Sequence, residues 1–234
     1  CHHNAPPDLD EASGLGTYSC STCHVPEAGF KPNNFQGIAD GGVAYGIAGE
    51  KRAMNTEYKE NEIDVQSARP LTMVNVAYVI NTMWNGSFGG GHVNVGTEHL
   101  WKNEVGTARN VLGLSGMETQ NMDGLIVHRI RTDKAIFDKL GYTKMFDEAF
   151  PEFPESERYT LKTASFALSA YIRSILSTKA PFQDWLKGDL NALSYEEKKG
   201  GILFFGKANC SNCHYEPNLG SHEFHALGVK DMYQ

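Results

Sequence analysis

Cys20-Ser21-Thr22-Cys23-His24 and Cys210-Ser211-Asn212-Cys213-His214 are two copies of one pattern near the two ends of a chain of 234 residues. Cys-x-x-Cys-His is the attachment site of c-type haem, in which both thiols bind the porphyrin and the His becomes the proximal iron ligand. Cys-x-x-Cys alone is also typical of a zinc site, a redox dithiol or a disulfide. The copies lie too far apart for a zinc ribbon, and a thioredoxin-like βαβ context is missing. We therefore predict two covalently bound c-type haems, with His24 and His214 as iron ligands.

The composition is ordinary for a soluble protein, with 21% charged residues, 41% hydrophobic residues and a formal net charge of −7. A chain of this length can form one or two buried cores. It contains no basic stretch with interleaved aromatic residues, which argues against nucleic acid as a partner. No apolar run reaches membrane-spanning length, since the longest candidate, Thr72 to Trp84, is interrupted by Asn75 and Asn81.

Four of the five cysteines lie in the two motifs, and Cys1 is left over. Because c-type haem is attached outside the bacterial cytoplasm, the sequence predicts an exported protein of the periplasm or cell envelope that has lost its signal peptide. Cys1 is then either the lipid-modified first residue of a lipoprotein or the mark of an incomplete N-terminus. No helix precedes the first motif, and the chain ends about twenty residues after His214. We therefore expect a fragment with a truncated C-terminal haem domain.

Three helices are predicted from local signals. Ser194-Tyr195-Glu196-Glu197 forms a capping box, and it starts a helix that runs to Phe205 before the second motif. Thr132 is expected to cap a helix that continues through Leu140 and stops at Gly141. Residues 157–177 have apolar side chains at helical spacing and form the strongest amphipathic pattern in the chain.

The remaining sequence predicts loops and a domain boundary. Residues 29–62 and 86–116 are rich in Gly and Asn and have little periodicity, which is typical of long loops. Residues 178–193 contain Pro181 and Gly188 and resemble an inter-domain connection. We expect an all-α protein of two cytochrome c-like haem domains with long irregular loops, residues 1–177 and 178–234.

Between Asp8 and Val229 several short segments accompany the two motifs in a fixed order. They are Gly16-Thr17-Tyr18-Ser19, Arg69-Pro70-Leu71-Thr72-Met73-Val74-Asn75-Val76-Ala77, Trp84-Asn85-Gly86, Glu118-Thr119-Gln120, Ala149-Phe150-Pro151, Lys187-Gly188-Asp189-Leu190-Asn191-Ala192-Leu193-Ser194 and Phe224-His225-Ala226-Leu227-Gly228-Val229. In this order the chain resembles the bacterial di-haem cytochrome c peroxidases and the related di-haem enzyme that matures methylamine dehydrogenase.

The resemblance implies a division of labour between the haems. The haem on His24 would be the low-potential peroxidatic site, and the haem on His214 the high-potential entry point for electrons. Trp84 would lie between them and assist electron passage. Gln120 and His128 would form the distal pocket, where an imidazole can move protons during O–O cleavage. The plain alternatives are a core Trp at position 84 and a surface or structural His at a helix start.

The chain departs from the family pattern in its axial and calcium ligands. Residues 25–91 contain no His, so the first iron is either open or receives a ligand from the loop that contains His92 and His99. The family's inter-haem calcium site uses an Asn just after an Arg in the segment before Trp84, and the position of that Asn is occupied here by Arg69, which argues against calcium. The residues that could cap the second iron within this chain are Met232, Tyr215 and Tyr233, whereas His222 and His225 could lie near a haem edge.

The activity implied by the resemblance is reduction of hydrogen peroxide to water, with electrons from a small cytochrome c or cupredoxin. The sequence also leaves open whether the protein forms a homodimer. One alternative is an electron-transfer di-haem cytochrome, or a subunit of a larger redox assembly, without peroxidase activity. Another is oxidation of a protein partner. A peroxidase needs one open iron position, whereas a pure carrier needs two irons with both axial positions filled.

Overall fold

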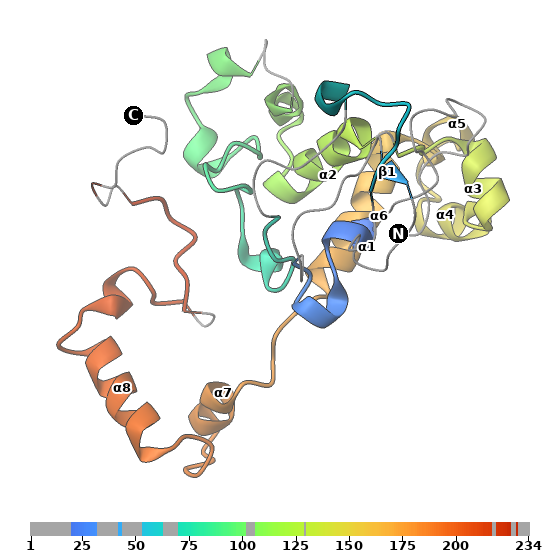
Figure 1. The fold of residues 1–234 in the computed structure, drawn as a ribbon. Helices are drawn as coiled ribbons and strands as arrows, with labels where there is room; N and C mark the ends of the chain where they lie inside the picture. Colours follow the sequence, from blue (N-terminus) through green and yellow to red (C-terminus); the bar gives the residue numbers. More distant parts are fainter. Residues whose placement is uncertain are drawn as a thin grey trace. The chain divides into compact units, whose positions relative to one another are not determined.

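The computed structural model describes residues 20–31, 42–43, 53–62, 70–101, 106–128, 130–216, 219–225 and 228. The chain forms two compact units, Cys1–Ile175 and Leu176–Gln234 (Figure 1). The described part is helical with almost no strand, so the prediction of a helical protein is confirmed, while a haem domain in each unit stays a prediction. Cys1, Arg69, Met232 and Tyr233, which the sequence singled out, lie outside the described residues.

Short helices and turns make up most of unit 1. Its α-helices are α1 (Cys20–Cys23), α2 (Gly116–Val127), α3 (Lys134–Leu140), α4 (Thr143–Ala149), α5 (Glu155–Arg158) and α6 (Leu161–Arg173). Its 3-10 turns are η2 (Pro26–Ala28), η3 (Glu60–Glu62), η4 (Val76–Tyr78), η5 (His92–Asn94), η6 (Glu98–Leu100) and η7 (Thr107–Leu112). Among the described residues there is one two-stranded antiparallel sheet, which the sequence did not predict, in which β1 (Gly42–Val43) lies beside β2 (Ala53–Met54).

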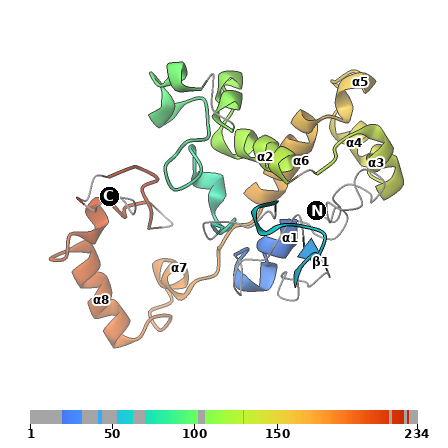
Figure 2. The same cartoon turned by 45° about the horizontal axis from the view of Figure 1, so that its top comes forward.

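Helices α2 and α6 pack side by side and form the centre of unit 1 (Figures 1 and 2). Their contact is largely polar. The Ser165 hydroxyl donates to the Glu118 carbonyl at 2.7 Å, and the Asn121 amide donates to the Ser169 hydroxyl at 2.9 Å. Both serines are fully buried, and such buried polar groups require partners. The interface is therefore specified by hydrogen bonds as well as by apolar contact.

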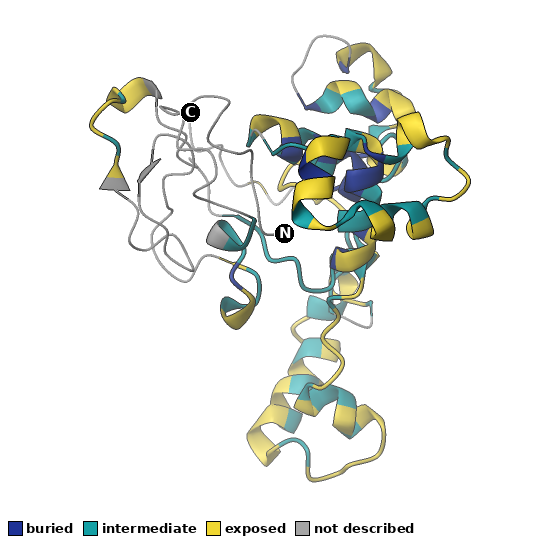
Figure 3. Cartoon of the chain, turned by 90° about the vertical axis from the view of Figure 1, so that its right-hand side faces the viewer, coloured by how far each residue is buried: buried dark blue, intermediate teal, exposed yellow. Residues whose placement is uncertain are grey.

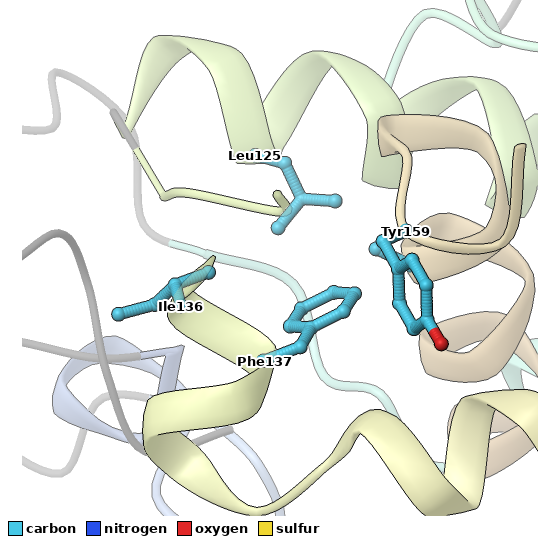
Figure 4. Packing of buried hydrophobic residues seen from close by; sticks show 5 residues of the cluster. Leu125, Ile136, Phe137 and Tyr159 are labelled. Carbon is cyan, nitrogen blue, oxygen red and sulfur yellow. The ribbon is translucent and has the colours of Figure 1, made fainter. Parts of the chain in front are cut away.

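An apolar cluster joins the C-terminal end of α2 to the helices that follow. Leu125, Ile136, Phe137 and Tyr159 converge in this cluster (Figure 4), and Ala164 of α6 completes it. The ring of Phe137 lies over the cluster, with its edge toward Tyr159 at a centroid distance of 6.1 Å. Burial of Leu125, Ile136 and Phe137, each contributing about 1.5–3 kcal/mol, stabilises the packing of α3 against the α2–α6 pair.

Two of the predicted helices begin at other residues than expected. Asp133, not Thr132, caps α3, because its carboxylate accepts the Ile136 amide at 3.2 Å; Gly141 ends α3 in a left-handed conformation, as predicted. The pattern over residues 157–177 is divided into α5 and α6. The division falls at Thr160, whose hydroxyl forms a capping box with Thr163 and so starts a new helix.

The loop predicted over residues 86–116 is held by three asparagines. The Asn81 side chain donates to the Phe88 and Gly91 carbonyls, each at 3.1 Å. The Asn94 side chain donates to the Gly86 and Gly89 carbonyls at 2.9 and 2.8 Å, and fully buried Asn110 accepts the Gly89 amide and donates to Ser87. Side-chain amides thus bind the backbone groups of this loop, which in a sheet would be bound by a neighbouring strand. The loop contains the turns η5, η6 and η7.

Unit 2 contains α7 (Pro181–Leu186), α8 (Tyr195–Phe205) and the turn η8 (Cys210–Asn212). The expected capping box at the start of α8 is present, with reciprocal bonds between Ser194 and Glu197. Residues 178–193 were expected to be a plain connection, but α7 lies within them because Pro181 stands at its first position. Figure 3 shows the buried residues gathered in unit 1, and α7 and α8 contain none.

Among the described helices, none is long and apolar enough to cross a membrane.

Candidate haem sites

The first Cys-x-x-Cys-His motif forms a single helical turn, α1. The His24 amide donates to the Cys20 carbonyl at 2.8 Å, which continues the turn and brings both thiols and the imidazole into one short segment. The chain then reverses, and Val25 pairs with Lys31 in an isolated bridge. Val25 is almost completely buried and anchors this reversal.

The reversal orients the imidazole of His24. The carbonyl of Phe30 lies 3.0 Å from Nδ1 of His24, so this nitrogen carries the proton and donates it. Phe30 has a φ of 57°, in the left-handed region, and its own amide donates to the Val25 carbonyl at 2.8 Å. The bond fixes the tautomer and the ring plane, which leaves Nε2 as the lone-pair nitrogen for a metal.

Electrostatics also favour a neutral imidazole at this position. Burial lowers the pKa of His24, and the nearby charge of His128 lowers it further, while the Phe30 carbonyl acts in the opposite direction. A His must be neutral to bind iron, so the surroundings favour the form that binds.

The second motif is built in the same way. The turn η8 contains the two cysteines, and the His214 amide donates to the Cys210 carbonyl at 3.0 Å. The Leu219 carbonyl lies 2.8 Å from Nδ1 of His214, and Leu219, like Phe30, has a φ of 57°. The ring of Phe204 lies beside His214, with centroids 6.2 Å apart.

Both sites therefore fit a c-type haem on the chemistry of their own residues. No disulfide joins the four motif cysteines, Cys20 and Cys23 in one site and Cys210 and Cys213 in the other, so their sulfurs can form thioether bonds. Each His directs Nδ1 to a backbone carbonyl and keeps Nε2 for the iron. No group of three or more His, Cys, Asp or Glu that could hold another metal occurs among the described residues.

Comparison with known families agrees with this geometry. The family model described as di-haem cytochrome c peroxidase matches residues 10–191, which is most of the chain. The chain belongs to the di-haem cytochrome c peroxidase family. Membership confirms the prediction of two covalently bound c-type haems, while their attachment at the motifs of His24 and His214 stays a prediction.

Three curated members of the family show how distant the similarity is. The chain is 26% identical to the cytochrome-c peroxidase IdrP1 of Pseudomonas sp. strain SCT, over 94% of this chain and 47% of that protein. It is also 26% identical to the methylamine utilization protein MauG of Methylorubrum extorquens, over 93% of this chain and 49% of that protein. The cytochrome c peroxidase Ccp of Escherichia coli is again 26% identical, with coverages of 93% and 37%. The chain spans about half the length of such relatives.

Trp84 lies at the tip of the hairpin closed by the Thr82–Phe88 bridge, and its side chain is 76% exposed. It is not a core residue of unit 1, so the alternative of a core Trp at position 84 is wrong. The hairpin is held by the Asn81 and Asn94 amides described above, so the indole stands on a fixed turn. Its proposed place between the haems stays a prediction.

Gln120 and His128 both come from α2. Gln120 is half-buried, and its Nε2 donates to the Met83 sulfur at 3.2 Å, so it contacts the Trp84 hairpin. His128 ends α2 as its C-cap, so the expectation of a helix start was wrong. Its charge acts on both Cys20 and His24, whose pKa values it lowers. His128 thus lies near the first attachment site, while its role as acid–base stays a prediction.

The other histidines singled out by the sequence lie elsewhere. His92 and His99 are exposed in η5 and η6. In unit 2, His222 forms an ion pair of 3.3 Å with Glu216, and His225 lies 3.7 Å from Glu223. Tyr215 donates to Glu223 at 3.2 Å, and no ligand role follows for any of them.

Sequence reasoning missed a carboxylate and an ion pair on α2. Asp123 is one turn beyond Gln120, 3.6 Å from Arg109, and burial raises its pKa against the opposing charges of Arg109 and His128. Glu118 forms a bidentate pair with Arg173 of α6. Burial alone would raise the pKa of Glu118, but hydrogen bonds from Arg173 and Ser115 outweigh it and lower the pKa. Polar residues on one helix carried no periodic signal that would have indicated these pairs.

Proposed function

We propose that this protein reduces hydrogen peroxide to water at the haem on His24, with electrons that enter at the haem on His214 from a small soluble redox protein. The reaction consumes one peroxide, two electrons and two protons and produces two waters. An exported location goes with this proposal, because c-type haem is attached outside the cytoplasm. A lipid anchor at Cys1 and a homodimer remain predictions.

When bound, a haem would supply an iron that can exchange electrons and bind an oxygen ligand. His24 would hold the haem iron through Nε2, and the Phe30 carbonyl fixes the plane of the imidazole. The amide of Gln120 can orient peroxide, since it offers both a donor and an acceptor. His128 takes a proton from one peroxide oxygen and returns one to the other oxygen, which leaves as water.

The observation that carries this proposal is the proximity of His128 to His24 and Cys20: burial lowers the pKa of His24 and raises that of Cys20, and the charge of His128 acts to lower both. It supports a proton-transferring group at the first attachment site, in a family described as cytochrome c peroxidases. Electron passage through Trp84 is supported by its exposure on a fixed hairpin.

The test uses the haem-loaded protein with a reduced small cytochrome c or cupredoxin as donor. Peroxide-dependent oxidation of the donor should be stoichiometric, at two electrons per peroxide. His128→Ala should lower its rate by about 10²–10⁴, the usual worth of a positioned proton shuttle, with unchanged haem content. Exposed His99→Ala is the matched control and should behave as the native protein. Normal turnover in His128→Ala would remove His128 from the mechanism.

A second candidate is oxidation of a protein partner, favoured by the similarity to the methylamine utilization protein MauG. The spectrum of the oxidised protein separates a peroxidase or protein oxidase from a pure carrier. One high-spin iron indicates an open position, whereas two low-spin, six-coordinate irons indicate an electron carrier or a subunit of a redox assembly. Donor oxidation without peroxide consumption would contradict peroxide reduction.

A further inference from the structure

The hairpin that holds Trp84 places a thioether against Gln120. Nε2 of Gln120 lies 3.2 Å from Sδ of Met83, which is close for an N–H···S bond. Met83 has a φ of 73°, in the left-handed region that L side chains rarely adopt. This conformation persists because the Thr82–Phe88 bridge and the Gly86 amide, which donates to the Met83 carbonyl at 3.1 Å, fix the turn.

The sulfur is accessible as well as fixed. The Met83 side chain is 43% exposed, whereas Met117 and Met122 on α2 are only 3% and 2% exposed. Two other methionines are at least as open as Met83, Met54 at 43% and Met145 at 62%, and neither has a hydrogen bond from a glutamine among the described contacts. Exposure therefore does not distinguish Met83, but its position beside Gln120 does.

Gln120 can hold a peroxide molecule next to this sulfur. A glutamine amide has two N–H donors and one carbonyl acceptor, so one donor can serve the sulfur while the other donor and the carbonyl bind a second group. Hydrogen peroxide offers both lone pairs and O–H groups to such an amide. A thioether is the side chain in this hairpin that peroxide can oxidise in a single two-electron step.

We propose that Met83 is a peroxide-dependent modification site, converted to methionine sulfoxide by the substrate of the neighbouring haem site. The inference rests on the proposed function in that hydrogen peroxide is the substrate. In the reaction an S–O bond forms and the O–O bond breaks. The sulfur loses two electrons, the peroxide gains them, and the departing oxygen leaves as water with both protons.

The modification changes the Gln120 contact. A sulfoxide oxygen is a stronger acceptor than a thioether sulfur and projects beyond it, so it draws the Gln120 amide away from its present position. Gln120 is then less available to orient peroxide, and excess substrate slows the site. The change is reversible, because methionine sulfoxide reductases restore the thioether.

The experiment treats the haem-loaded protein with hydrogen peroxide in steps and follows each methionine by peptide mass spectrometry. Met54, with the same exposed fraction, is the internal control. Met83 should be oxidised about tenfold faster than Met54, because positioning raises the local concentration of peroxide. In Gln120→Ala this advantage should vanish, and sulfoxide reductase should reverse the modification.

Equal or slower oxidation of Met83 relative to Met54 would overturn the inference, and so would an advantage that survives in Gln120→Ala. Donor-coupled peroxide turnover, measured on the same samples, separates the two proposals. Absence of turnover rejects the proposed function whatever happens at Met83. Normal turnover with unselective methionine oxidation rejects only the modification site.

Discussion

Gly116 is the residue at which α2 meets the hairpin that holds Trp84. A Cβ atom at this position would lie 2.6 Å from the Thr82 nitrogen, 2.7 Å from the Phe88 oxygen and 2.9 Å from the Ile80 oxygen. All three are backbone atoms, and the Gly116 amide also donates to the Ile80 carbonyl at 2.8 Å. The neighbours of Gly116 therefore cannot turn away as a flexible side chain could. We expect Gly116→Ala to push the hairpin off the helix.

The magnitude follows from two opposing effects. Ala is favoured over Gly inside a helix by about 0.8–1.0 kcal/mol, and by less at the first position. Overpacking against a rigid neighbour costs about 1–3 kcal/mol. Gly116→Ala should then destabilise the protein by roughly 1–2 kcal/mol. Gly124→Ala is the matched control in the same helix, because its Cβ would meet no atom within 4 Å, and it should stabilise by about 0.5–1 kcal/mol.

The assay is thermal and urea unfolding of the two haem-loaded variants, monitored by far-ultraviolet circular dichroism. The expected difference between them is about 1.5–3 kcal/mol, or roughly 3–12 °C in Tm for a chain of this size. If Gly116→Ala melts at or above the temperature of Gly124→Ala, the close packing of α2 against the hairpin is wrong. A loss confined to Gly116→Ala, with unchanged helix content, supports it.

Three further predictions concern side chains in unit 1. Glu118→Gln should lower the free energy of unfolding by about 2 kcal/mol at neutral pH, since Arg173 loses a buried but partly hydrated partner. The pKa of Glu118 is lowered from 4.5, so urea unfolding should show this difference above pH 4.5 and its loss as the pH falls through the lowered pKa. Asp133→Ala should cost about 1 kcal/mol by removing the α3 cap, and Asp133→Asn much less, as measured by urea unfolding. Ultraviolet titration should find one phenol fewer ionising near pH 12 in Tyr159→Phe, since the hydrogen bond to Asp147 raises the pKa of Tyr159 to about 12; an unchanged titration would contradict that bond.

The parts that could be predicted from the sequence depend on local interactions. The capping box at Ser194 and the helix stop at Gly141 need only neighbouring residues, and both were placed correctly. The two haem motifs could be predicted for the same reason, because in each of them five consecutive residues contain all the groups that attach a haem. Asp133 was missed only because Thr132 is an equally good capping residue by type, and the choice between them depends on the backbone of a single turn.

Helix α2 could not be predicted, for a tertiary reason. Glu118 and Thr119 are buried on it, so its apolar side chains do not form a stripe. Its partners are Ser165 and Arg173 of α6, about fifty residues further along the chain. A polar helix of this kind is stable only when paired. The proposed distal residues Gln120 and His128 lie on α2 and at its C-cap, so their positions were harder to predict than those of the motif residues.

The two proximal sides are equivalent, and this bears on the division of labour between the haems. In each site a left-handed residue, Phe30 or Leu219, offers its carbonyl to Nδ1 of the iron-binding His at 3.0 or 2.8 Å. Such a hydrogen bond raises the basicity of a metal-binding His, and here it would act on both haem irons in the same sense. A difference in chemistry must therefore arise on the distal side or from burial of the ring. His128, at the end of α2, lies near Cys20 and His24 of unit 1, so experiments that seek the origin of the difference should begin with that helix.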